Sequence, residues 1–209
     1  MQAAFIGYGE LGEQIHALIQ QVNPGMKAIF FDDELFAKKS PGALPFSSYL
    51  AEDYRDHSFI ICLGYKSPGV KQQIIQRLTD SRRTIISFCH PTCFISTAAK
   101  IGAGTVIYPM CNIDKEVKIG KGVLLNNSVT VSHNAMIGDC CYLSPGVVLS
   151  GNVIIGEKTF IGTGALVANN VTIGNNVIVG IGTVVTKDVP DNSFVIGNPM
   201  QFVKNLQLT

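Results

Sequence analysis

Residues 113–148 read IDKEVK-IGKGVL-LNNSVT-VSHNAM-IGDCCY-LSPGVV, and each group of six begins with Ile, Leu or Val. The same period runs from Ile95 to Pro190, with an aliphatic residue at the start of sixteen consecutive groups and no change of phase. The fifth residue of each group is small or β-branched, and Gly or Asn is frequent at the second and fourth positions. A six-residue period fits neither an α-helix nor an ordinary strand, and it is typical of a parallel β-helix.

Each group of six is predicted to form one short strand and one turn, and three groups to close one triangular coil. Residues eighteen apart in the sequence therefore stack on one another. The first residue of each group is expected to point into the prism, and the fifth to fit where the prism narrows. Gly and Asn are expected in the turns because both tolerate positive φ at little cost.

The composition limits the classes of function. The chain has 209 residues, of which 46% are hydrophobic, and a net charge of +1 without a basic run, so a nucleic-acid or membrane-surface partner has no electrostatic support. The N-terminus has no charged leader, and no apolar run approaches the roughly 18 residues of a membrane helix. We therefore predict a cytoplasmic protein with no nucleic-acid partner and no membrane partner.

The six cysteines are expected to be reduced. Cys62, Cys111 and Cys141 lie in apolar patterns, as core thiols of a cytosolic protein do. The other local cluster, Cys89, His90 and Cys93, would need more ligands nearby to hold zinc, so no metal site is predicted.

The first ninety residues have a different pattern, in which strands and helices alternate. Strands are predicted at 3–7, 27–31, 59–64 and 84–88, and helical spacing is found after residue 12 and over 70–78. This is the pattern of a small α/β, Rossmann-like βαβ domain. We predict this domain over residues 1–90, a β-helix over 91–191 and a C-terminal tail over 192–209.

A glycine-rich turn follows the first predicted strand, with Gly7 and Gly9 in the sequence GYGELG, and Asp32-Asp33 ends the second strand. Backbone N–H groups at the start of a helix bind phosphates, and acidic residues at a strand end bind a ribose or base. Three interpretations remain open: a site for the nucleotide of a substrate, a site for a dinucleotide cofactor such as NAD, or a structural turn. The first is favoured because about four strands make only half a dinucleotide fold.

His133 is the only histidine of the repeat, and it is the third residue of its group, so it is predicted to lie on a turn and to face outward. Gly151, eighteen residues later, leaves space beside the imidazole and a backbone N–H within reach. A neutral imidazole can accept a proton from an amine or hydroxyl, and an N–H can stabilise an oxyanion, which suits acyl transfer. The alternative interpretation is an ordinary surface histidine.

The whole chain resembles the bacterial sugar acetyltransferases of the hexapeptide-repeat family that are related to sialic-acid O-acetyltransferase. It is most similar to those that N-acetylate nucleotide-linked 4-amino sugars. The resemblance is carried by the repeat, the glycine turn, the strand end FFDD at 30–33, the run 125–146 and the motif IGNP at 196–199. It implies a left-handed β-helix after a Rossmann-like domain, and a homotrimer with active sites between subunits. It also implies direct transfer from acetyl-CoA without a metal.

The resemblance also implies roles for individual residues. His133 is then the general base, Asn126 contributes to the active site, and the amide of Gly151 contacts the thioester of acetyl-CoA. The nucleotide lies near Asp32 and Asp33, beside the glycine turn. The pantetheine arm follows outward turns of later coils, at Thr163, Gly164, Ile181 and Gly182.

Three positions depart from the family pattern. Asn134 stands where relatives commonly carry the Asp or Glu that orients the catalytic histidine, although its position also favours Asn for backbone reasons. Tyr142 and Leu11 each replace a histidine that several relatives carry, and they affect the expected contacts of the acetyl donor and the phosphates.

The predicted function is an acetyl-CoA-dependent N-acetyltransferase acting on a UDP- or dTDP-linked 4-amino-4,6-dideoxy sugar. The alternative is a sugar or sialic-acid O-acetyltransferase, because one imidazole serves amine and hydroxyl acceptors equally. Two further alternatives are a non-catalytic β-helix that binds sugar nucleotides and an NAD-dependent enzyme.

Overall fold

The computed structural model describes residues 2–203. The chain divides into two compact units, Met1–Phe88 and Cys89–Thr209, which are described separately.

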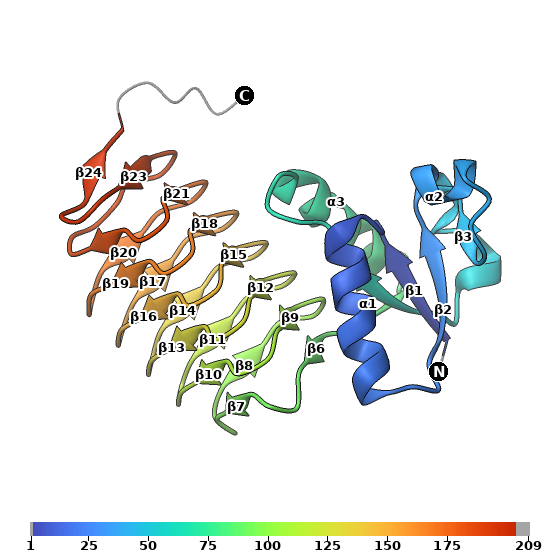
Figure 1. The fold of residues 1–209 in the computed structure, drawn as a ribbon, viewed down its shortest axis with the longest axis horizontal. Coiled ribbons are helices and arrows are strands. Elements are labelled where there is room, and N and C mark those ends of the chain that lie inside the picture. Colours follow the sequence, from blue (N-terminus) through green and yellow to red (C-terminus); the bar gives the residue numbers. More distant parts are fainter. Residues whose placement is uncertain (1, 204–209) are drawn as a thin grey trace. The chain divides into compact units, whose positions relative to one another are not determined.

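The first unit is an α/β unit with one parallel sheet of five strands in the order β3-β2-β1-β4-β5 (Figure 1). This order is that of the first five strands of a doubly wound dinucleotide-binding sheet. Sequence reasoning expected four strands, and the additional strand is β3, whose two residues are too few to produce a period. The strands are β1 (Gln2–Ile6), β2 (Lys27–Phe31), β3 (Ala43–Leu44), β4 (Ser58–Ile61) and β5 (Thr84–Ile85).

Three α-helices accompany this sheet: α1 (Glu10–Val22), α2 (Asp33–Ala37) and α3 (Pro68–Asp80). Two 3₁₀ helices, Phe46–Ser48 and Glu52–Tyr54, lie between β2 and β4, where the sequence predicted no helix or strand. The helix α1 begins directly after the glycine turn and carries Glu10 and Glu13 in its first turn, where the helix dipole favours acids. Its buried face holds Ile15 and Ile19.

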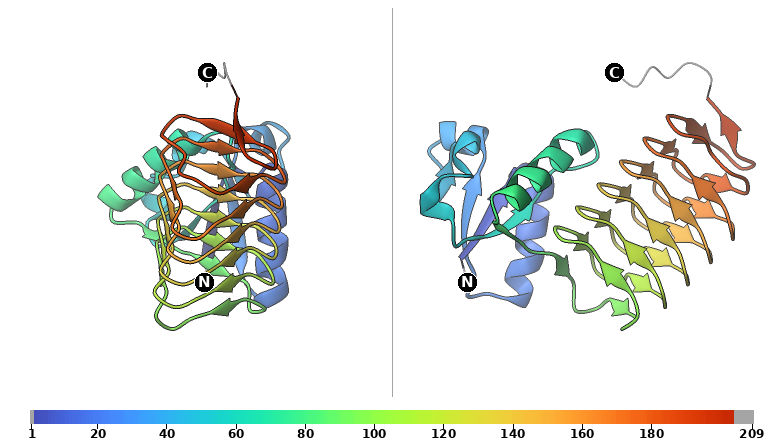
Figure 2. Two further views of the ribbon diagram at one scale, coloured as in Figure 1. Left: turned by 90° about the vertical axis from the view of Figure 1, so that its left-hand side faces the viewer. Right: turned by 180° about the vertical axis from the view of Figure 1, so that it is seen from behind.

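The second unit is a parallel β-helix whose coils stack on one another (Figure 2). Its short strands form three sheets, here called faces 1, 2 and 3. Face 1 contains β6 (Phe88–Cys89), β9 (Val106–Ile107), β12 (Leu124–Leu125), β15 (Tyr142–Leu143), β18 (Phe160–Ile161), β21 (Ile178–Val179), β23 (Phe194–Ile196) and β24 (Gln201–Phe202). Face 2 contains β7 (Phe94–Ile95), β10 (Asn112–Ile113), β13 (Thr130–Val131), β16 (Val148–Leu149), β19 (Leu166–Val167) and β22 (Val184–Val185). Face 3 contains β8 (Lys100–Ile101), β11 (Lys118–Ile119), β14 (Met136–Ile137), β17 (Ile154–Ile155) and β20 (Thr172–Ile173).

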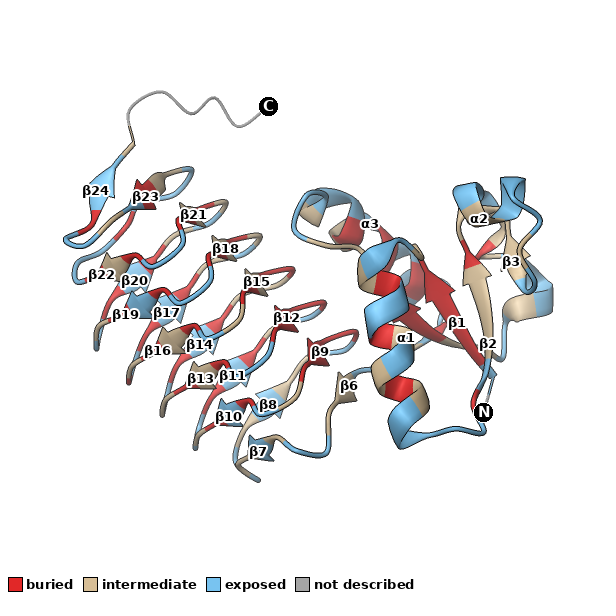
Figure 3. Ribbon diagram, in the orientation of Figure 1, coloured by how far each residue is buried: buried red, intermediate tan, exposed pale blue. Residues whose placement is uncertain are grey.

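The aliphatic residue that begins each group of six is the second residue of its strand and points into the prism. These residues are buried from Ile107 to Val185, and they form one continuous core with the small residues of the fifth position (Figure 3). Ile95 and Ile101, in the first coil, are only partly buried. The predicted period, the eighteen-residue stacking and the inward position of the aliphatic residues are therefore confirmed.

Gly and Asn occur in the turns for two different reasons. The fourth position has positive φ in every group from Gly104 to Gly182, even where it is Met110 or Lys158. The second-position glycines do not share this conformation. A Cβ on Gly156, for example, would lie 2.5 Å from the carbonyl carbon of Gly174, so glycine is needed there because adjacent coils approach closely. The expectation that positive φ explains both positions was wrong for the second one.

The β-helix continues beyond the predicted boundary at residue 191. The strand β23 pairs in parallel with β21, and β24 pairs antiparallel with β23. Met200 is buried and joins the core. Part of the predicted tail thus extends face 1, whereas residues 204–209 lie outside the described part of the chain. The left-handed sense of the β-helix and the Rossmann-like class of the first unit stay predictions.

Candidate active site

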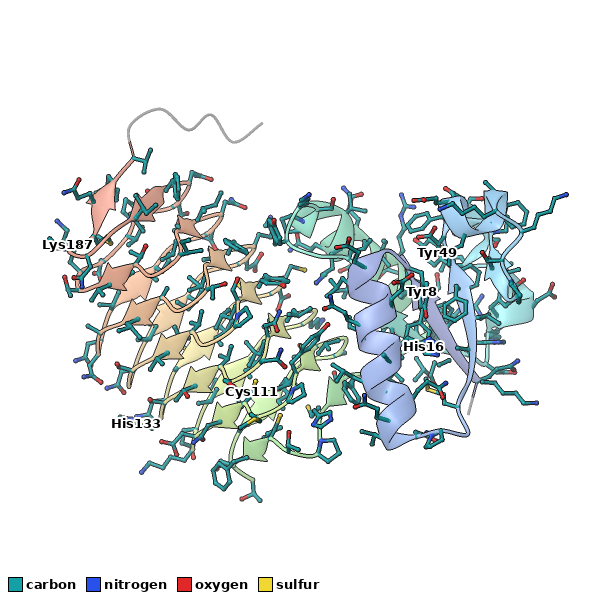
Figure 4. The ribbon with its side chains drawn as sticks, viewed as in Figure 1. Tyr8, His16, Tyr49, Cys111, His133 and Lys187 are labelled. Carbon is teal, nitrogen blue, oxygen red and sulfur yellow. The ribbon has the colours of Figure 1, made fainter. Side chains whose placement is uncertain are left out.

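His133 lies on the edge of the prism where face 2 turns into face 3, immediately after β13 (Figure 4). This edge, here called the His133 edge, consists of the turns 114–117, 132–135, 150–153 and 168–171. The side chain of His133 is partly exposed. Its imidazole projects over the next coil, because a Cβ built on Gly151 would lie 2.5 Å from Cε1 and 2.6 Å from Nε2 of the ring. The structure thus brings His133 and Gly151 together, as the eighteen-residue spacing predicted.

Asn134 contacts the other side of the imidazole. Its Nδ2 lies 3.3 Å from Nδ1 of His133 and donates a hydrogen bond to Oδ1 of Asn152 at 3.0 Å. Its φ of 61° is one that asparagine tolerates well, so the conformational reason for Asn at this position holds. The side chain also touches the ring, so the two interpretations of Asn134 are compatible.

The backbone amide of Gly151 differs from the expectation. It donates to Oδ1 of Asn169, one coil further along the same edge, at 2.9 Å. The same arrangement recurs elsewhere, where Lys121 donates to Asp139 and Glu157 to Asn175. The Gly151 N–H is therefore not free to bind an oxyanion in this structure, and Asn169 is a nearby group that sequence reasoning missed. The eighteen-residue period would have placed it beside Gly151.

Asn126 lies on a different edge, where face 1 turns into face 2. Its side chain is 9% exposed; Oδ1 accepts from the N–H of Asn127 at 2.7 Å, and Nδ2 donates to the hydroxyl of Tyr142 at 3.1 Å. The residues predicted for the pantetheine arm lie on this same edge, which is here called the Asn126 edge. They are exposed and comprise Thr163, Gly164, Ile181 and Gly182.

Within one chain, face 2 separates the His133 edge from the Asn126 edge. One chain therefore unites His133, Asn134 and Gly151, and it does not bring Asn126 or the residues predicted for the pantetheine arm to the imidazole.

The first unit contains a polar cavity of about 250 Å³ beside the glycine turn. Gly9 and Asp32, two of the residues that the sequence assigned to a nucleotide site, line it. Its remaining lining residues are Tyr8, Glu10, Glu13, Glu34, Leu35 and Lys38. Four of the eight lining residues are acidic, and the one basic residue, Lys38, is paired with Glu34 at 2.5 Å. Such a lining suits hydroxyl and N–H donors of a ribose or base better than it suits phosphates.

Asp32 is largely occupied by the backbone of its own unit. Its Oδ2 accepts from the N–H of Tyr8 at 2.8 Å, and its Oδ1 accepts from Glu34 and Leu35 at 3.0 Å, which caps α2. Asp33 is exposed, and its Oδ1 accepts from the N–H of Phe46 at 2.8 Å. The carboxylate of Asp32 therefore joins residues of the cavity wall to one another and keeps little capacity for a ligand.

Gly7 and Gly12 fix the shape of the glycine turn. Gly7 has a φ of 77°, and a Cβ on Gly12 would lie 2.7 Å from the carbonyl oxygen of Gly7. Gly9 has open space around its Cα, which leaves its backbone accessible. The turn is thus partly structural, as one of the three interpretations held, and its open position lies at the cavity.

Sequence reasoning missed an aromatic cluster beside this turn. The hydroxyl of Tyr8 lies 2.5 Å from Nδ1 of His16, and the ring of Tyr8 packs on Phe30 with centroids 4.1 Å apart (Figure 4). Burial lowers the pKa of His16 and raises the pKa of Tyr8, which favours the neutral form of each group. The only signal in the sequence was the eight-residue spacing of Tyr8 and His16 across the start of α1.

Among residues 2–203, no group of three or more His, Cys, Asp or Glu side chains is placed to hold a metal ion. In the cluster at 89–93, Nδ1 of His90 lies 2.9 Å from the hydroxyl of Thr92, and Cys93 donates to the carbonyl of Tyr108. No helix in the described part of the chain has the length and apolar character needed to cross a membrane.

Comparison with known proteins gives a consistent result. Residues 116–151 match the model of the bacterial transferase hexapeptide family (six repeats). No curated protein sequence matches the chain. The acetyltransferase domain of PglB from Neisseria gonorrhoeae, solved in complex with acetyl coenzyme A, is 27% identical, with a TM-score of 0.88 over 97% of this chain and 98% of that one. WeeI from Acinetobacter baumannii is 26% identical, with a TM-score of 0.86 over 97% of this chain and 100% of that one.

The chain is an acyltransferase. A third solved structure shares its fold at 24% identity, with a TM-score of 0.88 over 98% of both chains. It is PerB from Caulobacter crescentus, in complex with CoA and GDP-perosamine.

In this acyltransferase, the predicted residues fall into three groups. One group, on the His133 edge, contains His133, Asn134 and Gly151. A second group, on the Asn126 edge, contains Asn126, Thr163, Gly164, Ile181 and Gly182. Gly7, Gly9, Asp32 and Asp33 are at or beside the cavity of the first unit. Chemically, the acyltransferase presents an imidazole on a rigid turn, with open space created by a glycine.

Proposed function

We propose that the protein transfers the acetyl group of acetyl-CoA to the amino group of a nucleotide-linked 4-amino-4,6-dideoxy sugar. The observation that carries this proposal is the imidazole of His133, partly exposed on a rigid edge and lying over Gly151. The likeness over nearly the whole chain to the acetyltransferase domain of PglB, which was solved in complex with acetyl coenzyme A, supports the donor. The polar cavity beside the glycine turn supports an acceptor that carries a nucleotide.

The proposed mechanism is direct transfer without an acyl-enzyme. The sugar amine attacks the thioester carbonyl, a C–N bond forms, and the C–S bond breaks to release the thiolate of CoA. His133 accepts the proton of the attacking amine at Nε2 and returns it to the thiolate. General-base catalysis of this kind contributes about 10²–10⁴-fold to a rate.

The oxyanion of the tetrahedral intermediate needs a hydrogen-bond donor. The N–H of Gly151 serves this purpose only when Oδ1 of Asn169 releases it, since the two are bonded at 2.9 Å. A thioester carbonyl at this position would take the place of the Asn169 oxygen. We therefore include Asn169 among the groups that respond to the binding of acetyl-CoA.

The proposed active site includes two copies of the chain. His133 and Asn134 come from the His133 edge of one subunit, and Asn126, Thr163 and Ile181 from the Asn126 edge of a neighbour. This assignment explains why residues implied in one site lie on different edges of a single chain. It corresponds to a homotrimer of left-handed β-helices, each preceded by a Rossmann-like nucleotide-binding domain, in the cytoplasm.

A thiol-release assay tests this proposal. Purified protein is given acetyl-CoA and a panel of UDP-, dTDP- and GDP-linked 4-amino sugars, with free sialic acid as a hydroxyl acceptor, and His133→Ala is assayed alongside. We expect rapid turnover of one nucleotide amino sugar, lost in the variant, which still binds acetyl-CoA. Turnover of the hydroxyl acceptor alone would replace the proposal by O-acetylation. Undiminished turnover by the variant would remove His133 as the base.

A further inference from the structure

Three asparagines stack on the His133 edge, one in each of three consecutive coils. Nδ2 of Asn134 donates to Oδ1 of Asn152, and Nδ2 of Asn152 donates to Oδ1 of Asn170, both at 3.0 Å. All three have φ near 60°, so the backbone holds their side chains in one column. This column, here called the amide ladder, ends on the imidazole of His133, because the Nδ2 position of Asn134 is also 3.3 Å from Nδ1 of the ring.

The direction of the amide ladder determines which nitrogen of His133 is basic. The oxygen and nitrogen of an amide occupy equivalent positions, so the ladder fits the same atomic sites in either direction. When Nδ2 of Asn134 points toward the ring, Nδ1 of His133 must accept its hydrogen bond. The neutral imidazole then carries its proton on Nε2. With Oδ1 of Asn134 toward the ring, Nδ1–H donates, and Nε2 keeps its lone pair.

The position of the two ring nitrogens favours the second direction for catalysis. The Cβ position of Gly151 is 2.6 Å from Nε2 and 3.2 Å from Nδ1, so Nε2 is the nitrogen over the open space. Once the imidazole has accepted a proton at Nε2, Nδ1–H still donates to Oδ1 of Asn134. The opposite direction would set an N–H group of Asn134 against Nδ1–H of the imidazolium.

We propose that Asn152 and Asn170 are positioning residues, which hold Oδ1 of Asn134 toward Nδ1 of His133 and so make Nε2 the base. Nδ2 of Asn170 then donates to Oδ1 of Asn152, and Nδ2 of Asn152 donates to Oδ1 of Asn134. The proposal rests on the proposed function, in which His133 is the general base. A chain of neutral amides thereby takes the role that a carboxylate beside the histidine would fill.

The ladder itself carries no charge. The ionisable groups on the same edge are Asp114, Lys115 and Glu116, one coil before His133. Beyond the four turns named above, Lys187 and Asp188 follow β22. The coil that His133 overlies carries Gly151 and Asn152 at its turn, both neutral. The direction of the hydrogen bonds is therefore the nearest influence on the tautomer of the ring.

Two variants that each add one carboxylate to the ladder test the proposal. The carboxylate of Asn152→Asp can only accept hydrogen bonds, so Asn134 must place Nδ2 toward residue 152. The same atom of Asn134 contacts His133, so Nδ2 then also faces Nδ1 of the ring. The imidazole must carry its proton on Nε2, and Nε2 can no longer act as the base. We expect kcat to fall about 10²-fold, the lower end of a general base's contribution. Asn134→Asp instead offers an acceptor to Nδ1–H. We expect it to preserve the lone pair on Nε2 and to move the acidic limb of kcat/KM upward by about one pH unit.

The two variants add the same charge within one coil of each other, so a purely electrostatic effect would change both in the same direction. Asn and Asp both tolerate positive φ, so both variants are expected to fold. The matched control is Asn176→Asp, because Nδ2 of Asn176 donates to Oδ1 of Asn192 at 3.2 Å in a similar stack on another edge. The control is expected to have the activity of the unmodified protein.

The tautomer of His133 can be measured without activity. The ¹⁵N shifts of the imidazole, assigned by comparison with His133→Ala, are expected to report a proton on Nδ1 in the unmodified protein and on Nε2 in Asn152→Asp. If His133→Ala is inactive but Asn152→Asp and Asn134→Asp have equal activities and tautomers, the ladder only joins the coils and the positioning role is wrong. If His133→Ala keeps full activity, the proposed base itself is wrong.

Discussion

The imidazole of His133 fills the space that a side chain on Gly151 would occupy. A Cβ at this glycine would lie 2.5 Å from Cε1 and 2.6 Å from Nε2 of the ring, although the two residues are eighteen positions apart in the sequence. Glycine is therefore needed at position 151 so that the imidazole of His133 can lie over this coil. Its φ is not in the left-handed region, and its Cβ would meet no atom closer than those of the ring.

The first prediction is that Gly151→Ala lowers activity without unfolding the protein. The new methyl group must push aside the partly exposed imidazole, and misplacing a catalytic group by about 1 Å can cost ~10²-fold in rate. We expect kcat to fall by this factor and the thermal midpoint to stay close to that of the unmodified protein, measured by thiol release and calorimetry.

Two other glycines serve as controls for this variant. A Cβ on Gly25 meets no atom within 4 Å, so Gly25→Ala is expected to change neither activity nor stability. A Cβ on Gly156 meets the backbone of Gly174 at 2.5 Å, so Gly156→Ala is expected to unfold the β-helix. Full activity in Gly151→Ala would show that the position of the ring over Gly151 is irrelevant to catalysis.

The second prediction concerns Asp32, whose carboxylate accepts three backbone N–H groups. Asp32→Asn replaces one of its acceptor oxygens by a donor and so removes one or two of these hydrogen bonds, which are partly buried or exposed and contribute about 0.5–1.5 kcal/mol each. We expect a loss of stability in urea unfolding together with a higher KM for the nucleotide sugar. For the exposed Asp33, which accepts from Phe46 alone, the loss in Asp33→Asn should be smaller, below about 1 kcal/mol. A higher KM in Asp32→Asn at unchanged stability would instead indicate that Asp32 binds the substrate directly.

The third prediction separates an outer from an inner aliphatic residue of the β-helix. Ile181 is 71% exposed on the Asn126 edge, whereas Leu143 is fully buried in the core. Ile181→Ala is expected to raise the KM for acetyl-CoA several-fold and to change stability by less than about 0.5 kcal/mol. Leu143→Ala should cost about 2–5 kcal/mol, as measured by denaturant unfolding. An unchanged KM in Ile181→Ala would exclude this residue from the donor site.

The fourth prediction concerns the thiols at the start of the β-helix. The adjacent thiol of Cys111 lowers the pKa of Cys93 to about 7, whereas burial raises the pKa of Cys89 to about 11. Since the thiolate is the reactive form, alkylation of Cys93 by iodoacetamide should rise through pH 7 and level off above pH 8. Cys89 should react much more slowly at the same pH, as followed by peptide mass spectrometry.

The same experiment can contradict the predicted order of reactivity, in which Cys93 reacts faster than Cys89. The S–H of Cys93 also donates to the carbonyl of Tyr108 at 3.0 Å, which favours the protonated thiol. Faster alkylation of Cys89 than of Cys93 at pH 8 would mean that this bond outweighs the effect of Cys111.

The sequence predicts the β-helix well because one constraint is repeated in every coil. The burial of the aliphatic residues from Ile107 to Val185 follows from the six-residue period, and the juxtaposition of His133 and Gly151 follows from the eighteen-residue stack. The end of the β-helix was harder to predict, because β23 joins face 1 after the period has ended at residue 190. The strand β3 was missed because it has only two residues and is recognised only by its pairing with β2.

The site was predicted less completely, because hydrogen bonds between side chains leave no periodic signal. The bond from the Gly151 amide to Asn169 and the occupation of Asp32 by backbone N–H groups depend on side-chain orientation. The contact between Tyr8 and His16 depends on how α1 packs. These features become visible only when the coordinates of the turns are known, and they change which groups are free to meet a ligand.

The stacking of the coils has a consequence for the length of any molecule that binds along an edge. Each coil advances an edge by one strand spacing, about 4.8 Å. Two groups on one edge are therefore separated by a whole number of such steps, and no intermediate separation is available. Deletion of eighteen consecutive residues would remove one step and keep every column aligned. Deletion of six or twelve residues would move the columns onto other faces, and deletion of any number that is not a multiple of six would break the period. The number of coils between two groups in one column thus sets the distance between them.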